Sequence, residues 1–258
     1  MILGFDIGNT STTAALYPEE RTLPEYTFRF PTVKDTGPAE LYRQVQDGMF
    51  RCGMGTDTYF IKGLAFSSVV PEINHAYHAM AEKNLALSAH EISCASRLNF
   101  TIRYDDPRQL GVDRIVNAAA VFSEYGGGAI VVDIGTAVTF CVLLEEDIFD
   151  GGIIAPGIDT AITSLSLRAS RLPEVPFEKP GRVVAKNTVD ALKSGFFHGW
   201  VSLAEGIIAK IEKEYGRGFS VILTGGFAGK VAEHLDHANI VDLLLPMKGI
   251  KILYDLNT

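Results

Sequence analysis

One short motif occurs twice in this chain and constrains its fold more than any other feature. Asp6-Ile7-Gly8-Asn9-Thr10 follows the apolar residues 2–5, and Asp133-Ile134-Gly135-Thr136-Ala137 follows the apolar residues 129–132. After each copy the chain continues with Thr and apolar residues. Each copy therefore predicts a strand, a tight turn and a second strand. Because the copies open the two halves of a 258-residue chain, they predict two similar domains that close on a nucleotide.

The residue types in these turns favour phosphate binding. Glycine lets backbone N–H groups approach phosphate oxygens, and the following Asn or Thr adds a short side-chain donor. A carboxylate that faces a polyphosphate is repelled unless a cation lies between them, so Asp6 and Asp133 imply Mg²⁺ or another hard cation, held directly or through water. A single Asp-x-Gly is more often an ordinary turn. The duplication makes the phosphate interpretation the stronger one.

Composition narrows the class of protein. With 47% hydrophobic residues, the chain can bury one large core or two of moderate size. Its net charge of −8 opposes non-specific binding to nucleic acid or an anionic membrane. The three cysteines form no CxxC pair, which argues against a disulfide framework or a zinc site and indicates a reducing cytoplasm. We expect neither a usual signal peptide nor a transmembrane helix.

Strand and helix patterns alternate along the chain, which predicts the α/β class with a mixed sheet in each half. Beyond the two hairpins, strands are expected at residues 26–30, 59–66, 98–104 and 220–223, and helices at residues 38–50, 71–84, 111–125 and 187–215, with another that ends near residue 169. The predicted domain boundary lies near residue 116, which gives domains of residues 1–116 and 117–258. The loop at residues 172–180 is the expected mobile segment.

Gly111-Val112-Asp113-Arg114 places an acid beside a base at the start of a predicted helix. Asp113 can accept the proton of a hydroxyl that is being phosphorylated, and Arg114 can bind a substrate carboxylate with two parallel hydrogen bonds. The tetrapeptide alone leaves a second interpretation open, in which Asp113 caps the helix and Arg114 forms an ion pair on its surface.

Other motifs carry weaker signals. Thr224-Gly225-Gly226 is typical of a nucleoside-binding turn and equally of a glycine turn with no ligand. The glycine-rich residues 151–157 have the same two interpretations. The pairs His75/His78 and His234/His237 have helical spacing, but we interpret them as surface residues of amphipathic helices because neither has a third metal ligand nearby. Trp200 is predicted in the core or at a subunit interface.

Taken together, these motifs resemble the type III pantothenate kinases, members of the acetate and sugar kinase/Hsp70/actin superfamily. The resemblance runs almost end to end. It is carried by the two phosphate motifs, Gly111 to Arg114 and Thr224-Gly225-Gly226, together with residues 67–71, 151–157, 167–173, 187–188 and 194–195. It implies two ribonuclease H-like (actin-like ATPase) domains with mixed sheets and a cleft between them.

The resemblance also implies an activity, which is ATP-dependent phosphorylation of pantothenate to 4′-phosphopantothenate, the first step of coenzyme A biosynthesis. Asp113 would be the general base, Asp6 would lie near Mg²⁺, and Asp133 would support a monovalent cation, potassium or ammonium. ATP would contact Asp6, Ile7, Gly8, Asn9, Thr10, Ser11, Thr12, Thr13 and Thr136. Pantothenate would contact Tyr104, Gly111, Val112, Asp113, Arg114 and Thr188, with Arg114 at its carboxylate.

The family implies a homodimer whose substrate site lies close to the subunit contact, and no nucleic-acid or membrane partner. Two alternatives remain open at this point. One is a regulatory protein similar to the Bvg accessory factors, which share this fold. The other is a kinase or phosphatase of the same superfamily that acts on a sugar or an acyl phosphate.

Overall fold

A computed structural model describes residues 1–237 and 239–258, and its internal contacts divide the chain into two compact units. The first unit contains residues 1–127, 147–149 and 244–258, and the second contains residues 128–146 and 150–243. The last helix of the chain therefore belongs to the first unit. Residue 116, where the sequence suggests a domain boundary, lies inside a helix of the first unit, and the division at that residue stays a prediction.

The first unit is built on a five-stranded sheet in the order β3-β2-β1-β4-β5. Its strands are β1 (Ile2–Ile7), β2 (Ser11–Tyr17), β3 (Tyr26–Pro31), β4 (Gly63–Ser68) and β5 (Ala89–Glu91). The β1–β2 and β2–β3 pairs are antiparallel, whereas β1–β4 and β4–β5 are parallel, so the sheet is mixed as predicted. The strand expected at residues 59–66 begins only at Gly63, because residues 58–61 form a turn closed by the Ile61 N–H to the Thr58 carbonyl.

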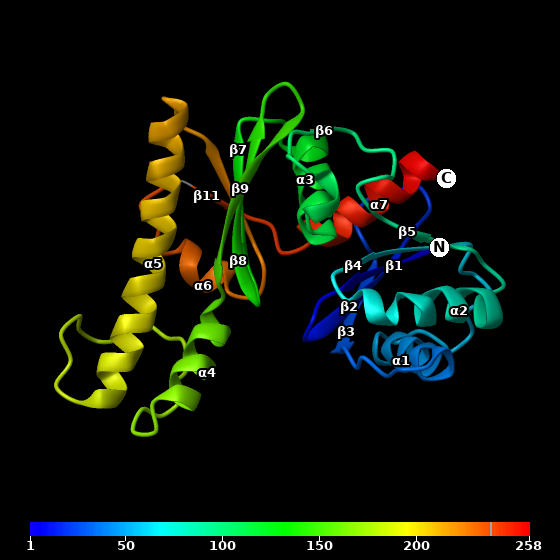
Figure 1. Cartoon of the computed structure of the whole chain (residues 1–258). Helices are drawn as coiled ribbons and strands as arrows, with labels where there is room; N and C mark the ends of the chain where they lie inside the picture. The colour runs from blue at the N-terminus through cyan, green and yellow to red at the C-terminus, as the bar shows by residue number, and fades with distance from the viewer. Residues whose placement is uncertain (238) are drawn as a thin grey trace. The chain divides into compact units, whose positions relative to one another are not determined.

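Helices cover both faces of this sheet (Figure 1). On one face lie α1 (Pro38–Arg51) and α2 (Asn74–Leu85), and on the other lie α3 (Val112–Glu124) and α7 (Leu245–Asn257). Leu3, Phe5 and Ile7 alternate along β1 and join the core shared with α1 and α2. The intervening residues of β1, which include Asp6, face α3 and α7.

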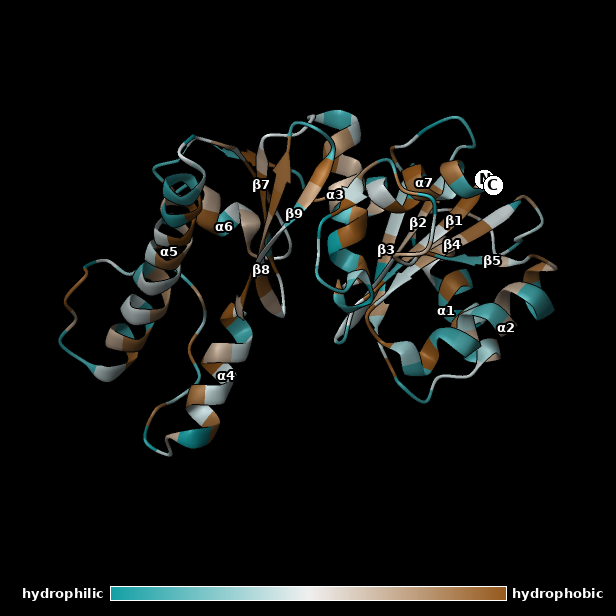
Figure 2. Ribbon diagram, turned by 45° about the horizontal axis from the view of Figure 1, so that its top comes forward, coloured by the Kyte–Doolittle hydropathy of each residue, from teal (hydrophilic) through white to brown (hydrophobic). Residues whose placement is uncertain are grey.

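The second unit contains the strand order β11-β10-β7-β8-β9. Its strands are β7 (Ala129–Ile134), β8 (Ala137–Leu144), β9 (Ile148–Pro156), β10 (Ser220–Thr224) and β11 (Asn239–Val241), and its helices are α4 (Ile158–Arg168), α5 (Thr188–Tyr215) and α6 (Ala228–Ala232). The β7–β8 pair is antiparallel, whereas β10 pairs in parallel with both β7 and β11. Figure 2 shows hydrophobic residues concentrated in these strands. Trp200 of α5 is buried in this core, as one of its two interpretations required.

One strand is much shorter than expected. The pattern at residues 98–104 yields only β6 (Thr101–Ile102), which pairs in parallel with the first residues of β9 inside the first unit. No helix in the described part of the chain is both long enough and apolar enough to cross a membrane.

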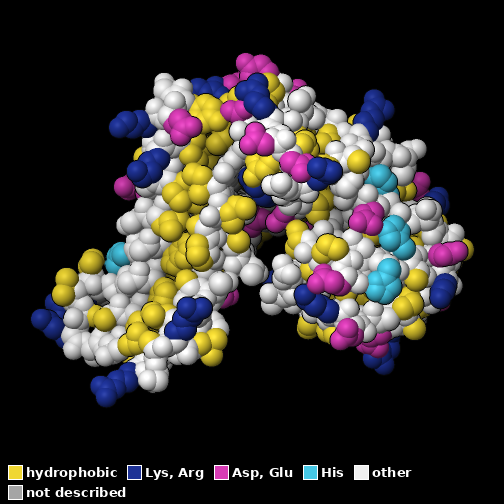
Figure 3. Space-filling view, viewed as in Figure 1, with side chains coloured by type: hydrophobic (Ala, Val, Ile, Leu, Met, Phe, Trp, Pro, Cys, Tyr) yellow, Lys and Arg dark blue, Asp and Glu magenta, His cyan; other side chains and the backbone are white. Residues whose placement is uncertain are grey.

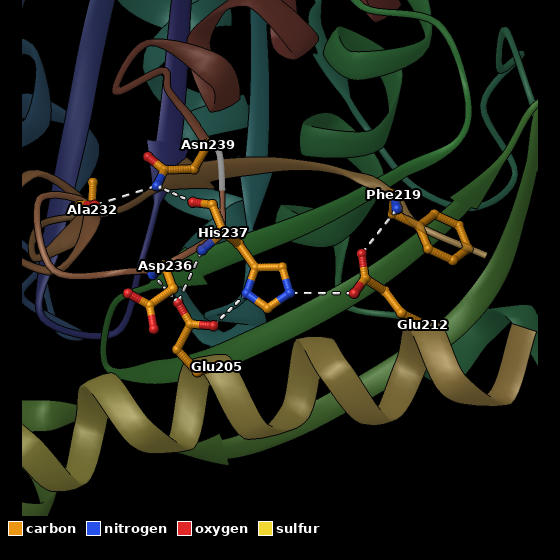
Figure 4. Close-up of polar contacts among 7 residues, drawn as sticks. All are labelled: Glu205, Glu212, Phe219, Ala232, Asp236, His237 and Asn239. Carbon is orange, nitrogen blue, oxygen red and sulfur yellow. Dashed lines mark hydrogen bonds and ion pairs between the residues drawn. The ribbon is translucent and has the colours of Figure 1, made fainter. Parts of the chain in front are cut away.

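His237 connects the segment before β11 to α5 through side-chain contacts. The sequence pattern predicted His237 on a helix, and this prediction is wrong, because α6 ends at Ala232. Its ring lies between two carboxylates of α5 (Figure 4): Nδ1 contacts Glu205, and Nε2 is 3.2 Å from Glu212 Oε2. Glu205 also accepts the backbone N–H of His237 at 3.2 Å. Both ring nitrogens donate only when the ring is protonated, so the geometry selects the imidazolium form.

We expect this contact to make stability depend on pH. Partial burial lowers the pKa of His237, but hydrogen bonds with Glu205 and Glu212 and their charges outweigh it and raise that pKa above its ordinary value. The stabilisation is therefore complete below about pH 6.5 and is lost as pH rises through the raised pKa. His237→Gln should lower Tm by roughly 2–4 °C at pH 6, and the deficit should shrink toward pH 9.

Differential scanning calorimetry across this pH range measures the effect. His75→Gln is the matched control, because His75 is exposed on α2. A Tm deficit of His237→Gln that stays constant from pH 6 to pH 9 would contradict the protonated contact.

Candidate active site

The first phosphate turn connects β1 to β2. The Gly8 N–H donates to the Ser11 carbonyl at 3.1 Å, and Asn9 and Thr10 at the tip are exposed. Behind the tip, Thr12 is fully buried, and its hydroxyl bonds the Thr32 hydroxyl at 3.0 Å. The core thus fixes the base of the turn, while its exposed tip can meet a ligand.

The second phosphate turn connects β7 to β8 in the same way. The Gly135 N–H donates to the Ala137 carbonyl at 3.0 Å. The carbonyl of exposed Thr136 accepts the Gly157 N–H at 3.1 Å and the Thr160 hydroxyl at 2.8 Å, which ties the turn to the start of α4. A Cβ at Gly157 would overlap the carbonyl oxygens of the turn. Glycine is therefore required there by close backbone packing.

Asp113 lies in the first turn of α3, half-buried. Its Oδ1 accepts the backbone N–H of Arg114 at 2.9 Å. Burial raises the pKa of Asp113, although this hydrogen bond and the charge of Arg114 act in the opposite direction. A carboxylate with a raised pKa is a stronger proton acceptor. A Cβ at Gly111 would overlap Asp113 Oδ1, so the carboxylate can occupy this position only because residue 111 has no side chain.

Arg114 is buried, which excludes the surface ion pair that the sequence left open. The other part of that interpretation, a structural role of Asp113 at the start of the helix, is not excluded, because its carboxylate accepts an N–H of the first turn. Its guanidinium carbon lies 5.3 Å from the centre of the Phe149 ring and 5.8 Å from that of Tyr104. The Arg103 N–H donates to the Phe149 carbonyl at 2.8 Å and brings the two aromatic rings together. Phe149 was not predicted from the sequence, because only long-range strand pairing places it beside Arg114.

The predicted site residues divide between the two units. The first unit holds Asp6, Ile7, Gly8, Asn9, Thr10, Ser11, Thr12, Thr13, Tyr104, Gly111, Val112, Asp113 and Arg114, and the second holds Asp133, Thr136 and Thr188. Within the first unit, Tyr104, Asp113 and Arg114 are brought together. Thr188 is exposed at the first position of α5, directly after Asn187, whose side chain caps the helix by accepting the Asp190 N–H at 2.9 Å.

A pocket of about 540 Å³ opens in the second unit beside the turn that follows β10. Its lining includes Gly226, Lys230, Phe177, Phe197 and Leu243. Pockets of this size and apolar character with a few polar groups suit small ligands. The pocket thus adjoins the turn that the sequence marked as typical of nucleoside binding.

The described residues contain no cluster of three His, Cys, Asp or Glu side chains that could hold a metal ion. Hydroxyl and carbonyl oxygens, water and phosphate are further ligands that a cation near Asp6 or Asp133 can take. Hard cations accept such ligands. The buried hydroxyls of Ser67 and Thr224 have no hydrogen-bond partner among the described residues, so oxygen donors fit a cation in both units.

The arrangement of two mixed α/β units, each with a phosphate-type turn after its central strand, defines the actin-like ATPase fold. Three solved structures share it over 98–99% of this chain. A Baf family protein from Campylobacter jejuni is 21% identical with a TM-score of 0.60 and 98% of its chain covered. An activator of 2-hydroxyisocaproyl-CoA dehydratase from Clostridium difficile, with bound ADPNP, is 12% identical with a TM-score of 0.58 and 95% covered. A ROK family glucokinase from Streptomyces griseus, in complex with glucose and AMPPNP, is 11% identical with a TM-score of 0.55 and 98% covered.

Sequence comparison identifies the family within this class. The family model for type III pantothenate kinase matches residues 2–210. Type III pantothenate kinases from Halalkalibacterium halodurans and Brevibacillus brevis are 35% and 36% identical to the chain over 257 residues, covering all of the chain and 100% and 99% of the relatives. The chain belongs to the type III pantothenate kinase family and is a kinase of pantothenate.

We expect Phe149 to set the affinity of the site for pantothenate through Arg114. Phe149→Leu keeps an apolar side chain but removes the ring over the guanidinium, a contact that contributes about 0.5–2 kcal/mol. KM for pantothenate should rise roughly 3- to 30-fold, while KM for ATP should change less than about twofold.

Steady-state kinetics with each substrate varied in turn measures the two constants. Phe100→Leu is the matched control, because Phe100 is buried in the same unit and stacks on Phe122. Equal increases in both KM values would indicate a general disturbance of the unit and contradict the role of Phe149.

Proposed function

We propose that Asp113 is the general base of the pantothenate kinase reaction of this chain. The observation that carries the proposal is the pairing of a half-buried carboxylate of raised pKa with a buried guanidinium one residue later. Asp113 accepts the proton of the pantothenate hydroxyl, whose oxygen bonds to the γ-phosphorus as the bond to the departing ADP oxygen breaks. Arg114 holds the substrate carboxylate and so orients the hydroxyl.

The other predicted pantothenate contacts belong to the same proposal. The rings of Tyr104 and Phe149 both lie near the guanidinium of Arg114. This position supports a contact of Tyr104 with the carboxylate end of the substrate. Gly111 and Val112 directly precede the base and can approach the substrate through their backbone. Thr188 is exposed at the start of α5, where its hydroxyl is accessible to a ligand.

ATP binding is proposed at the two phosphate turns. Residues 6–13 provide backbone N–H groups and short donors around the exposed tip at Asn9 and Thr10. Thr136 occupies the matching exposed position in the second unit. Asp6 would hold Mg²⁺, directly or through water, and the metal would neutralise charge on the polyphosphate. The nucleoside is placed in the pocket beside Gly226, where Phe177 and Phe197 offer aromatic surface.

Asp133 is proposed to hold the monovalent cation, potassium or ammonium. The hydroxyl residues Thr139 and Thr224, which pair with Asp133 on the two neighbouring strands, support this choice. The three cysteines form no CxxC pair in the sequence, and this pattern supports the proposed location in a reducing cytoplasm. A regulatory role like that of the Baf family gains support from the fold alone, because the solved Baf family protein is only 21% identical.

Replacing the base should abolish phosphotransfer without loss of nucleotide binding. Asp113→Asn keeps the size of the side chain and removes its basicity, so kcat should fall at least about 100-fold. Pantothenate-dependent ADP release, followed by a coupled assay, measures kcat, and calorimetry with a non-hydrolysable ATP analogue measures nucleotide affinity.

Asp106→Asn is a matched control, because Asp106 is an acid of the same unit whose partner is Arg108. It should retain turnover. Near-normal turnover of Asp113→Asn would remove Asp113 as the base, and a wild-type chain that releases no ADP in response to pantothenate would overturn the kinase assignment for this chain.

We also propose that the chain forms a homodimer through α5. Between residues 191 and 209 of this helix, the exposed residues are all small: Ala191, Gly195, Gly199, Ser202, Gly206 and Ala209. No atom lies within 4 Å of a Cβ added at any of the three glycines. Each glycine costs helix stability of about 1 kcal/mol relative to alanine. A second backbone packed against this stripe would compensate that cost.

Exposed apolar residues accompany the stripe on the same unit. Leu167 and Leu165 of α4 and Ile154 of β9 are exposed, and Phe196 of α5 is partly so. Figure 3 shows hydrophobic side chains gathered over α5 and α4 on the face in view. Burial of such residues is the usual source of stability in homodimer interfaces.

Gly199→Arg should convert the dimer to a monomer, because a long charged side chain separates the two helices. Light scattering coupled to size-exclusion chromatography measures the mass. Glu214→Arg introduces the same residue outside the stripe and should leave the dimer intact. A Gly199→Arg chain that retains the mass of the wild-type dimer would contradict the proposed interface.

A further inference from the structure

Strand pairing adds to the second phosphate turn a residue that the sequence repeat does not contain. Thr224, the last residue of β10, pairs in parallel register with Asp133 of β7. On the other side, Thr139 of β8 is the antiparallel partner of Asp133. Paired residues on neighbouring strands project to the same face of a sheet. Thr139, Asp133 and Thr224 therefore form one polar row at the carboxyl ends of β7 and β10.

The first unit has an equivalent row, in which the acid belongs to the repeated motif but the third residue comes from a segment unlike that of Thr224. Asp6 of β1 pairs with Thr13 of β2 and, in parallel register, with Ser67 near the end of β4. Ser67 stands before Ser-Val-Val-Pro and Thr224 before Gly-Gly, so no local sequence likeness relates the two hydroxyl residues. The same chemical order in both units indicates that the hydroxyl belongs to the site at each turn.

Both hydroxyls are buried and unsatisfied. Ser67 and Thr224 are each 0% exposed, and neither side-chain oxygen has a hydrogen-bond partner among the residues that the structure describes. Solvent does not reach these oxygens. Because an unsatisfied buried hydroxyl costs free energy, its partner is expected from a group that enters the site.

The surroundings of Asp133 indicate that the group that bonds the buried hydroxyl is a cation. A Cβ at Gly225 would lie 2.5 Å from Asp133 Oδ1, and one at Gly135 would lie 3.7 Å from it. Gly225 has a φ of +89°, a conformation that other residues rarely adopt. Two glycines thus keep side chains away from the carboxylate, and the hydroxyl residues Thr139 and Thr224 are its partners on the two neighbouring strands. A hard cation prefers an oxygen donor set.

We propose that Thr224 supplies a hydroxyl ligand to the cation held by Asp133, and that Ser67 is its counterpart at Asp6. The hydroxyl oxygen has two lone pairs for the cation and one proton for a separate acceptor. This inference rests on the proposed role of Asp133 and names a cation-binding residue that lies 91 positions further along the chain.

Cation binding can be measured without turnover. Thermal denaturation is followed while KCl replaces tetramethylammonium chloride at constant ionic strength, first without nucleotide and then with Mg²⁺ and a non-hydrolysable ATP analogue. The wild-type Tm should rise and saturate with potassium. Thr224→Val should raise the half-saturating potassium concentration at least about tenfold, whereas Thr224→Ser, which keeps the hydroxyl, should stay within about threefold.

A second readout separates cation binding from a structural role. In potassium-free buffer, the Tm of Thr224→Val should equal or exceed that of the wild type, because valine removes an unsatisfied buried hydroxyl. A lower Tm would show that the hydroxyl has a structural partner and would overturn the proposal. A potassium titration of Thr224→Val identical to the wild-type titration, or a wild-type Tm that does not respond to potassium in either condition, would also overturn it.

The test also separates this proposal from the kinase reaction. A wild-type chain without pantothenate-dependent ADP release, but with a potassium-dependent Tm that Thr224→Val abolishes, would overturn the proposed reaction and support the cation ligand. Active wild-type enzyme with an unchanged titration in Thr224→Val would do the reverse.

Discussion

A carboxylate at the end of the central strand of each sheet is the constraint on which the rest of the structure depends. Asp6 and Asp133 are half-buried, and a carboxylate removed from water needs a compensating positive charge or hydrogen-bond donors. A polyphosphate nearby would increase that demand. Small groups lie near both acids: a glycine follows each acid two residues later, and hydroxyl residues pair with each acid on the two neighbouring strands. The strands and helices hold this arrangement at the carboxyl ends of parallel strands, where α/β sheets bind ligands.

Local sequence patterns predicted the phosphate turns and the main helices of both units. The turns at Gly8 and Gly135, the Pro-initiated helix α1 and the long helix α5 are where the residue patterns placed them. These features depend on glycine, proline and periodicity within one segment. The short strands β5, β6 and β11 were missed or overestimated because two or three residues form a strand only where a neighbouring strand pairs with them. Their stability comes from distant partners, which a local pattern does not contain.

The candidate site shows the same limit at the level of single residues. The tetrapeptide at Gly111 identified Asp113 and Arg114 but left open whether they served a helix surface or a ligand. Burial decided the question for Arg114, because a buried guanidinium near two aromatic rings forms no surface ion pair. The position of Phe149 beside Arg114 depends on the pairing of β6 with β9, and that of Thr224 beside Asp133 on the pairing of β10 with β7. Phe149 belongs to no motif, and the glycine motif that begins at Thr224 does not reveal that this residue lies beside Asp133.

The two similar rows have different surroundings, because different residues follow the two hydroxyl residues. In the first unit, Ser67 is followed by Ser68, whose hydroxyl accepts the Val70 N–H at 3.1 Å and turns the chain toward α2. In the second unit, Thr224 is followed by Gly225, and the carboxylate of Asp133 lies against its backbone. Ordered side chains shape the surroundings of the first acid, whereas bare backbone shapes those of the second. The family resemblance implies Mg²⁺ at Asp6 and a monovalent ion at Asp133, and our proposal of these two ions agrees with this difference, because Mg²⁺ keeps its water and a site close to the backbone leaves little space for that water.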